Sequence, residues 1–282
     1  MPQPISWIRH KLERARATLT AVSDGKLRTA ALNGEVDKVS LVLQKGKARV
    51  NSKDSWGHTA LYYALGSCES VGLGIQVADV LFAHGAKIRD ELLCASITSL
   101  QKQEVTRWLL EHGANTETRT SGDEGLTPLG LAIKLNELET ARMLLSHHAS
   151  VHAKDRLGRT PLHLARSSQA VTLLLDHGAR VNAQDKHHHT PLYTACVSNL
   201  PYLAQALLES GAILSKEILH DAKKHHAFRT LVVLHRWEAA QSIWLLMGSK
   251  QTPCKRLPVD LWREVRKLLS KSFPGDQNLN FL

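Results

Sequence analysis

The sequence predicts an all-α fold in which about six helix–turn–helix repeats stack into a solenoid with helical caps at both ends. Two recurring sequence blocks carry this prediction. One block has leucine-like residues, two polar residues and Gly-Ala, and the other begins with Thr-Pro-Leu or a close variant. The glycine of the first block, or its equivalent, stands at positions 46, 85, 113, 148, 178 and 211, and these five intervals average 33 residues. Self-similarity at such a period indicates a repeat protein.

The Gly-Ala block marks the end of the second helix of each repeat. It is clearest at Leu173–Ala179 and at Trp108–Ala114. A glycine at this place supplies the left-handed residue that terminates a helix. Histidines recur directly before the turn, and we expect their rings to hydrogen-bond turn carbonyls rather than hold a metal ion. They are His84, His112, His147 and His177.

The Thr-Pro-Leu block marks the start of the first helix. It reads TPLHLA over Thr160–Ala165, and related blocks begin at Thr59, Thr127 and Thr190. Threonine provides an N-cap oxygen, and proline is tolerated at the first helical position because its missing N–H has no intrahelical partner there. The segment between each glycine and the next threonine is polar and suits a hairpin-like turn.

Two helices, a tight turn and a hairpin in 33 residues, with TPLH at its start, resemble the ankyrin repeat. The resemblance covers roughly residues 24–247. We therefore expect an N-terminal capping helix within residues 1–23, an ankyrin-repeat array over residues 24–247, and a C-terminal helix and tail over residues 248–282. The junctions after Gly85 and Gly211 are too short for a projecting hairpin, which we call a finger.

The composition indicates a protein of a reducing compartment. The four cysteines lie at least 26 residues apart, so a disulfide scaffold is not expected. The first twenty residues lack a signal-peptide pattern, and no apolar stretch is long enough to span a membrane. We expect a cytoplasmic protein, and a nuclear one is also compatible.

Positive charge is concentrated at the two ends of the chain. The net charge is +10, from 36 basic and 26 acidic residues. Residues 1–28 carry a net charge of +4, and residues 250–272 carry +5. The array itself is therefore not the uniformly basic surface that nucleic acid favours. The alternative function that stays open is binding of nucleic acid or an acidic membrane surface through the basic termini.

The segment Leu257–Leu269 resembles the opening helix of an F-box. It begins Leu-Pro, followed by an acidic residue and an apolar stripe. In that family this helix contacts the Skp1 adaptor of a cullin ubiquitin ligase, and truncated copies of the PRANC type follow ankyrin arrays in poxviral and some bacterial host-interaction proteins. A helix that only packs onto the last repeat stays the alternative. The residues implied in adaptor binding are Leu257, Pro258, Leu261, Trp262 and Val265.

The sequence holds no catalytic motif, so we expect neither an enzyme nor a cofactor or metal site. The resemblance implies a monomeric module that binds a protein partner through finger tips and the exposed faces of the first helices. Trp56 is the strongest candidate, because an aromatic side chain at a projecting tip is costly to leave in water. The candidate partner-binding residues are Trp56, His58, Leu126, Lys134, Arg156, Leu157, Arg159, Lys186, His187 and His189.

Overall fold

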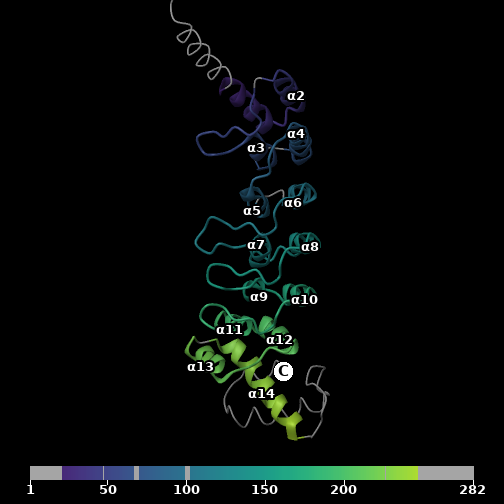
Figure 1. Ribbon diagram of the computed structural model, residues 1–282. Coiled ribbons are helices and arrows are strands. Elements are labelled where there is room, and N and C mark those ends of the chain that lie inside the picture. The colour runs from purple at the N-terminus through teal and green to yellow at the C-terminus, as the bar shows by residue number, and fades with distance from the viewer. Residues whose placement is uncertain (1–20, 47, 67–69, 99–101, 226, 247–282) are drawn as a thin grey trace, which may run out of the picture. The chain divides into compact units, whose positions relative to one another are not determined.

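The computed structural model describes residues 21–46, 48–66, 70–98, 102–225 and 227–246. These residues form helices and loops without a strand, which confirms the predicted all-α fold (Figure 1). They divide into two compact units, Met1–Thr120 with Ser146–His148 and Ser121–Leu145 with Ala149–Leu282. We call them unit 1 and unit 2. The capping helix expected before residue 21 and the F-box-like segment lie outside the described residues.

Unit 1 contains paired antiparallel helices in successive layers. A helix over residues 21–32 precedes α2 and spans the boundary expected at residue 23. The first helices α3 and α5 contact each other, and the second helices α2, α4 and α6 form a parallel row (Figure 1). The bounds are α2 Val36–Gln44, α3 Ala60–Gly66, α4 Val71–Ala83, α5 Asp90–Thr98 and α6 Lys102–Glu111.

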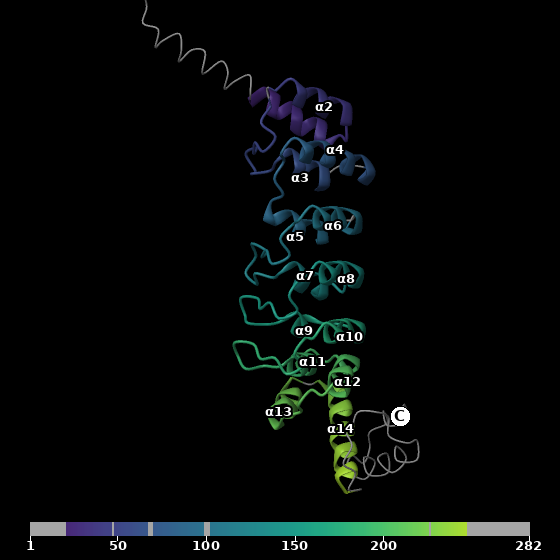
Figure 2. The same cartoon turned by 45° about the vertical axis from the view of Figure 1, so that its right-hand side comes forward.

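Unit 2 repeats this arrangement, with α9 as the shortest first helix. The first helices α7, α9, α11 and α13 pack in sequence, and α10 packs on α12, followed by the long helix α14 (Figure 2). The bounds are α7 Pro128–Lys134, α8 Leu138–Ser146, α9 Pro161–Leu164, α10 Ser168–Asp176, α11 Pro191–Val197, α12 Pro201–Glu209, α13 Lys216–Lys224 and α14 Phe228–Leu246.

One leucine per repeat joins the core to the end of each second helix. It lies four residues before the glycine of the Gly-Ala block, or before His148 where histidine replaces that glycine, and its side chain is fully buried in five repeats. Its carbonyl accepts the N–H of the alanine that follows the glycine, at 2.9–3.0 Å. The repeated block therefore buries an apolar side chain and closes the helix end at one position. These leucines are Leu81, Leu109, Leu144, Leu174 and Leu207.

The recurrent histidines complete the same helix ends. The ring Nδ1 of His84, His112 and His177 lies 2.8–2.9 Å from the backbone carbonyl four residues earlier. A cation or N–H donor at a helix C-terminus satisfies a carbonyl that has no intrahelical partner. The expectation that these rings bond turn carbonyls is confirmed for these three residues.

Fingers project before α3, α7, α9 and α11, whereas α5 and α13 begin without one (Figure 2). The two short junctions expected after Gly85 and Gly211 are thus confirmed. At the base of the fingers, threonine caps the next helix as expected: the Oγ1 atoms of Thr127 and Thr190 accept backbone N–H groups at 3.2 and 3.3 Å. Among the described residues no helix has the length and apolar character of a membrane span.

Candidate interaction surface

Three fingers are built on the same aspartate turn. An aspartate stands five residues before the capping threonine, and its Oδ1 accepts two backbone N–H groups of the finger. All six of these N···O distances lie between 2.8 and 2.9 Å. Such side-chain-to-backbone bonds hold a turn without a regular strand. The aspartates are Asp54, Asp155 and Asp185.

The third residue before the threonine, which we call the tip position, is exposed in three fingers and partly exposed in the finger before α7. Trp56 is 77% exposed and Leu157 is 42% exposed, although both are large and apolar. His187 and Glu124 occupy the same position and are also accessible. The tip position therefore leaves side chains accessible to solvent, and in three fingers an aspartate anchors the backbone beneath them.

The residue directly before the threonine, the inner position, faces its own first helix instead. His58 stacks on Tyr62 with ring centroids 3.9 Å apart, and His189 stacks on Tyr193 at 3.8 Å. Leu126 takes this position in the finger before α7 and is only 4% exposed. The expectation that Leu126 is an exposed contact residue is wrong, because the inner position points into the repeat rather than toward solvent.

Arg159 fills the inner position of the finger before α9 and joins an ion-pair network. Its guanidinium contacts Asp155 at 2.8 Å and Glu124 at 2.9 Å. Glu124 also pairs with Lys134 of α7. The hydrogen bonds from Lys134 and Arg159 lower the pKa of Glu124. Two predicted contact residues, Lys134 and Arg159, thus hold neighbouring elements of unit 2 together.

Backbone hydrogen bonds stack the fingers of unit 2 into a ladder. The N–H of Arg156 donates to the carbonyl of Glu124 at 2.8 Å, and the N–H of Lys186 donates to the carbonyl of Leu157 at 3.0 Å. In both cases the acceptor is the tip residue and the donor belongs to the next finger. Gly158 has φ +81°, and a Cβ added there would lie 2.8 Å from the Lys186 nitrogen. The close approach of the fingers therefore requires glycine.

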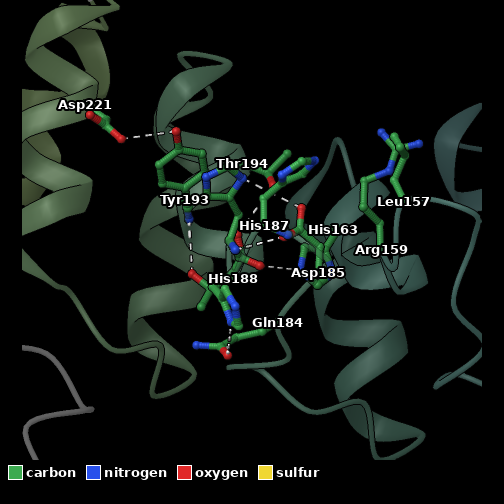
Figure 3. A network of polar contacts seen from close by, with 12 residues as sticks. Leu157, Arg159, His163, Gln184, Asp185, His187, His188, Tyr193, Thr194 and Asp221 are labelled. Atoms are coloured by element: carbon green, nitrogen blue, oxygen red, sulfur yellow. Dashed lines mark hydrogen bonds and ion pairs between the residues drawn. The ribbon is translucent and has the colours of Figure 1, made fainter.

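His163 links the finger before α11 to the start of α9, as Figure 3 shows. Its Nδ1 accepts the N–H of Thr160 at 3.1 Å, and its Nε2 lies 3.0 Å from the carbonyl of His189. The neutral ring therefore accepts through Nδ1 and donates through Nε2. Burial lowers the pKa of His163 and favours this neutral form.

Tyr193 takes the place of His163 in the next repeat and reaches forward in a similar way. Its hydroxyl donates to Oδ2 of Asp221 on α13 at 3.2 Å (Figure 3). Burial, together with this hydrogen bond to Asp221, raises the pKa of Tyr193. Because the same ring stacks on His189, Tyr193 connects the last finger to the following helix.

The finger of unit 1 is held mainly by side chains. Tyr63 donates its hydroxyl to Oδ2 of Asp54 at 2.6 Å, and this bond lowers the pKa of Asp54. Arg89, at the fingerless junction before α5, donates to the carbonyl of Gly57 at 2.5 Å. The Trp56 finger is thus fixed at its base and at its side, with the indole left in solvent.

The remaining predicted residues lie on the ladder. Arg156 donates from Nη1 to the carbonyl of Gly122 at 3.2 Å, while Lys186 and His187 are exposed. The described residues contain no group of three or more His, Cys, Asp or Glu side chains arranged to hold a metal ion. Burial raises the pKa of the Cys196 thiol to about 12. The fingers thus present exposed side chains on a backbone that hydrogen bonds hold in place.

Sequence reasoning missed the aspartates that hold the fingers. Asp54, Asp155 and Asp185 all stand five residues before a threonine, with glycine or histidine two residues before it. That shared offset was a signal for an aspartate turn. The same offset distinguishes the tip position from the inner position. It therefore excludes Leu126 from the exposed contact residues.

Stacked helix pairs with projecting hairpin fingers define a helical repeat protein. The family model "Ankyrin repeats (3 copies)" matches residues 74–155 and 148–218. Together these matches span residues 74–218, just over half of the 282 residues. The chain therefore belongs to the ankyrin-repeat family. Ankyrin repeats are generally protein–protein interaction modules, and their fold is typically non-catalytic.

Curated relatives are similar over short segments. Human Rabankyrin-5 is 47% identical over 57 residues, which are 20% of this chain and 5% of that protein. The putative ankyrin repeat protein FPV024 of fowlpox virus (strain NVSL) is 32% identical over 95 residues, 31% of this chain and 16% of that protein. The chain thus spans less than a fifth of the length of either relative.

Two solved structures share the fold with higher coverage. An ankyrin repeat domain from Acinetobacter baumannii AYE is 28% identical, with a TM-score of 0.56 over 66% of this chain and 98% of that one. A chain from the complex of the Bd0816 predatory endopeptidase of Bdellovibrio bacteriovorus with immunity protein Bd3460 is 26% identical, with a TM-score of 0.55. That match covers 65% of this chain and 97% of the other.

Proposed function

We propose that this chain is a non-catalytic module that binds a protein partner through its finger tips. The observation that carries the proposal is the tip position, where Trp56 and Leu157 stay exposed on turns whose backbone is anchored by aspartate. An anchored turn loses little conformational entropy when a partner binds, so more of the contact energy appears as affinity. Aromatic and arginine side chains at such places are the types enriched among binding hot spots.

The tips also differ in chemistry from finger to finger, which supports selective binding. Unit 1 presents the indole of Trp56, whereas unit 2 presents Leu157, His187 and the cationic side chains of Arg156 and Lys186. A few such anchors carry most of the energy of an interface, and the surrounding contacts exclude water. We infer that partner choice depends on these tips.

A comparative pull-down tests the proposal. The wild type and the double variant Trp56→Ala/Arg156→Ala are compared with Tyr202→Ala, which removes an 82% exposed aromatic side chain from α12 and serves as the matched control. Partners captured by the wild type should be lost from the double variant and kept by the control, with circular dichroism showing that all three are folded. An identical set of captured proteins for all three would refute binding through the tips.

A refinement is that the same chain adapts its partner to a ubiquitin ligase. Its support is the Leu-Pro-acidic-apolar pattern of Leu257–Leu269 and the similarity to a fowlpox ankyrin repeat protein. The test is co-purification of Skp1 with the full chain and with a chain that ends at Lys250. Capture of Skp1 by the full chain alone is the expected result, and capture by neither removes the refinement.

A further inference from the structure

The finger ladder of unit 2 ends at an open edge. Each tip carbonyl accepts an N–H from the next finger, first Glu124 from Arg156 and then Leu157 from Lys186. The next acceptor in this series is the carbonyl of His187. Because α13 begins without a finger, no N–H in the described part of the chain donates to that carbonyl. An unpaired backbone edge of this kind is a template for another extended segment.

The junction beside this edge is held in place by the preceding finger. Asn182 donates from Nδ2 to the carbonyl of Gly211 at 3.3 Å, and its Oδ1 accepts the N–H of Ile213 at 2.9 Å. The same clamp recurs in unit 1, where Asn51 bonds Gly85 and Lys87 at 2.9 and 2.8 Å. The backbone around Ile213 is therefore ordered, yet its side chain is 67% exposed.

In unit 1 a side chain bonds the carbonyl of the residue after the tip, and no described side chain does so in the last finger of unit 2. Arg89 immediately precedes α5 and donates to the finger carbonyl of Gly57 at 2.5 Å. Its equivalent before α13 is Ser215, whose hydroxyl accepts the N–H of Ile218 as a helix cap. A serine is too short to reach the finger as Arg89 does. The described residues of this junction therefore leave the carbonyl of His187 without a side-chain donor.

The charge around the open edge is positive. Lys186 is exposed and has no ion-pair partner in the ranges that the structure describes, and His187 projects beside it. Lys216 opens α13, with Glu217 as the adjacent acidic group. Asp185 does not offset this charge toward solvent, because its carboxylate is 7% exposed and accepts finger N–H groups. An occupant with acidic side chains is complementary to this surface.

We propose that an extended acidic segment of a protein partner docks where the missing finger of unit 2 would lie. Its backbone N–H bonds the carbonyl of His187, an aliphatic side chain covers Ile213, and a carboxylate pairs with Lys186. The fingers before α9 and α11 illustrate the kind of segment that can bind beside a finger. Each is an extended turn that donates a backbone N–H to the tip carbonyl of the preceding finger. This inference rests on the proposed function and names the chemistry of the partner.

Selection from a displayed library of random 12-residue peptides against the full chain tests the docking. Enriched peptides should combine Asp or Glu with Val, Ile or Leu. Their binding should weaken about tenfold in Ile213→Ser and in Lys186→Glu, the size expected when one apolar contact or one charge pair is lost. Inserting a copy of residues 183–189 between Leu214 and Ser215 should abolish binding, because the added finger fills the place.

Matched controls lie in unit 1. Leu41→Ser removes a 50% exposed aliphatic side chain, and Lys45→Glu reverses an exposed charge, so neither should weaken peptide binding. Failure to enrich any peptide, or enriched peptides that bind all variants equally, would overturn the docking. Binding of oligo-dT, or self-association of the chain, that is weakened by Ile213→Ser and Lys186→Glu would also overturn the docking. The edge would then bind a nucleic acid or a second copy of the chain instead of an acidic peptide.

The docking and the proposed function fail in distinguishable ways. If Trp56→Ala/Arg156→Ala loses its partners but Ile213→Ser does not weaken any peptide, the tips bind and the open edge does not. If the double variant keeps every partner, the proposed function itself fails. Enrichment of acidic peptides that depend on Ile213 would in that case place binding at the edge alone.

Discussion

The finger before α3 in unit 1 and the finger before α11 in unit 2 have the same internal design and different supports. Both have an aspartate turn, a histidine stacked on a tyrosine and an asparagine clamp to the following junction. The first is held from outside by the side chain of Arg89, whereas the second bonds the preceding finger through its backbone. The repeat motif thus specifies the turn, and its neighbours determine how the turn is supported.

This difference has a consequence for binding. An isolated finger with a side-chain support presents one large anchor, Trp56, beside the bond from Arg89 to Gly57. A laddered finger presents a smaller tip but leaves a backbone acceptor at its end. If the proposals above hold, side-chain burial dominates the contacts of unit 1, and main-chain pairing with charge adds to them in unit 2.

The largest expected effect compares Gly158→Ala with Gly57→Ala. Both glycines occupy the residue after the tip, with φ +81° and +83°. A Cβ at position 158 would lie 2.8 Å from the Lys186 nitrogen, whereas nothing lies within 4 Å of one at position 57. We expect Gly158→Ala to lower the free energy of unfolding by about 2–4 kcal/mol, and Gly57→Ala by about 1 kcal/mol from backbone strain alone.

Denaturant unfolding measures both glycine variants, and hydrogen exchange at the Lys186 amide localises the loss. The local measurement matters because repeat arrays can unfold in parts. Faster exchange at Lys186 should occur in Gly158→Ala and not in Gly57→Ala. Equal losses of stability in the two variants would contradict the hydrogen-bonded contact between the fingers before α9 and α11.

A second, intermediate effect concerns the link made by His163. Replacement by glutamine should lower the free energy of unfolding by about 1–3 kcal/mol at pH 7.5, because it disturbs the buried bonds to Thr160 and to the carbonyl of His189. Denaturant titrations of the wild type and the variant give this difference. His152→Gln, at an exposed position, is the control and should change stability little.

The same pair of proteins should differ in pH dependence. The pKa of His163 lies below its ordinary value of 6.5 in the folded chain, so the unfolded chain takes up the proton first as the pH falls. The stabilisation by the neutral ring is complete above pH 6.5 and decreases as the pH falls from 6.5 toward the folded pKa. The stability difference between the wild type and His163→Gln should therefore shrink at pH 5.5. A difference that grows on acidification would show that the ring is held protonated.

The smallest expected effect is the loss of the Glu124 network. Glu124→Gln should lower stability by about 0.5–1 kcal/mol, because its partners Lys134 and Arg159 are partly exposed and water screens the pairs. The pKa of Glu124 is lowered, so this contribution is complete above its ordinary value of 4.5 and is lost as the pH falls through the folded pKa. Thermal unfolding at pH 7 and pH 3.5 should show the difference at pH 7 only.

Glu91→Gln in unit 1 is the matched comparison for that network. Glu91 pairs with Arg89 at 2.9 Å but is 63% exposed, so its loss should be smaller than that of Glu124. A larger effect for Glu91 would mean that Arg89 depends on this partner to reach the finger. The finger of unit 1 would then depend on an ion pair for its support, as the fingers of unit 2 do.

Much of the architecture was predictable from the repeated blocks. The burial of one leucine per repeat and the histidine at the helix end follow from positions counted back from glycine. The absence of fingers before α5 and α13 follows from junction length. The burial of Leu126 differs from the sequence prediction, because a place in the finger does not by itself determine the direction in which a side chain faces.

Local sequence specified the helices, their caps and the aspartate turns, because these depend on bonds between residues that lie within about five positions of one another. The pairing of Arg156 with Glu124, the reach of Arg89 to Gly57 and the open carbonyl of His187 depend instead on residues from adjacent repeats. Such contacts arise when helices stack and bring fingers some 30 residues apart into register. Packing between repeats therefore decides which fingers are hydrogen-bonded to a neighbouring repeat.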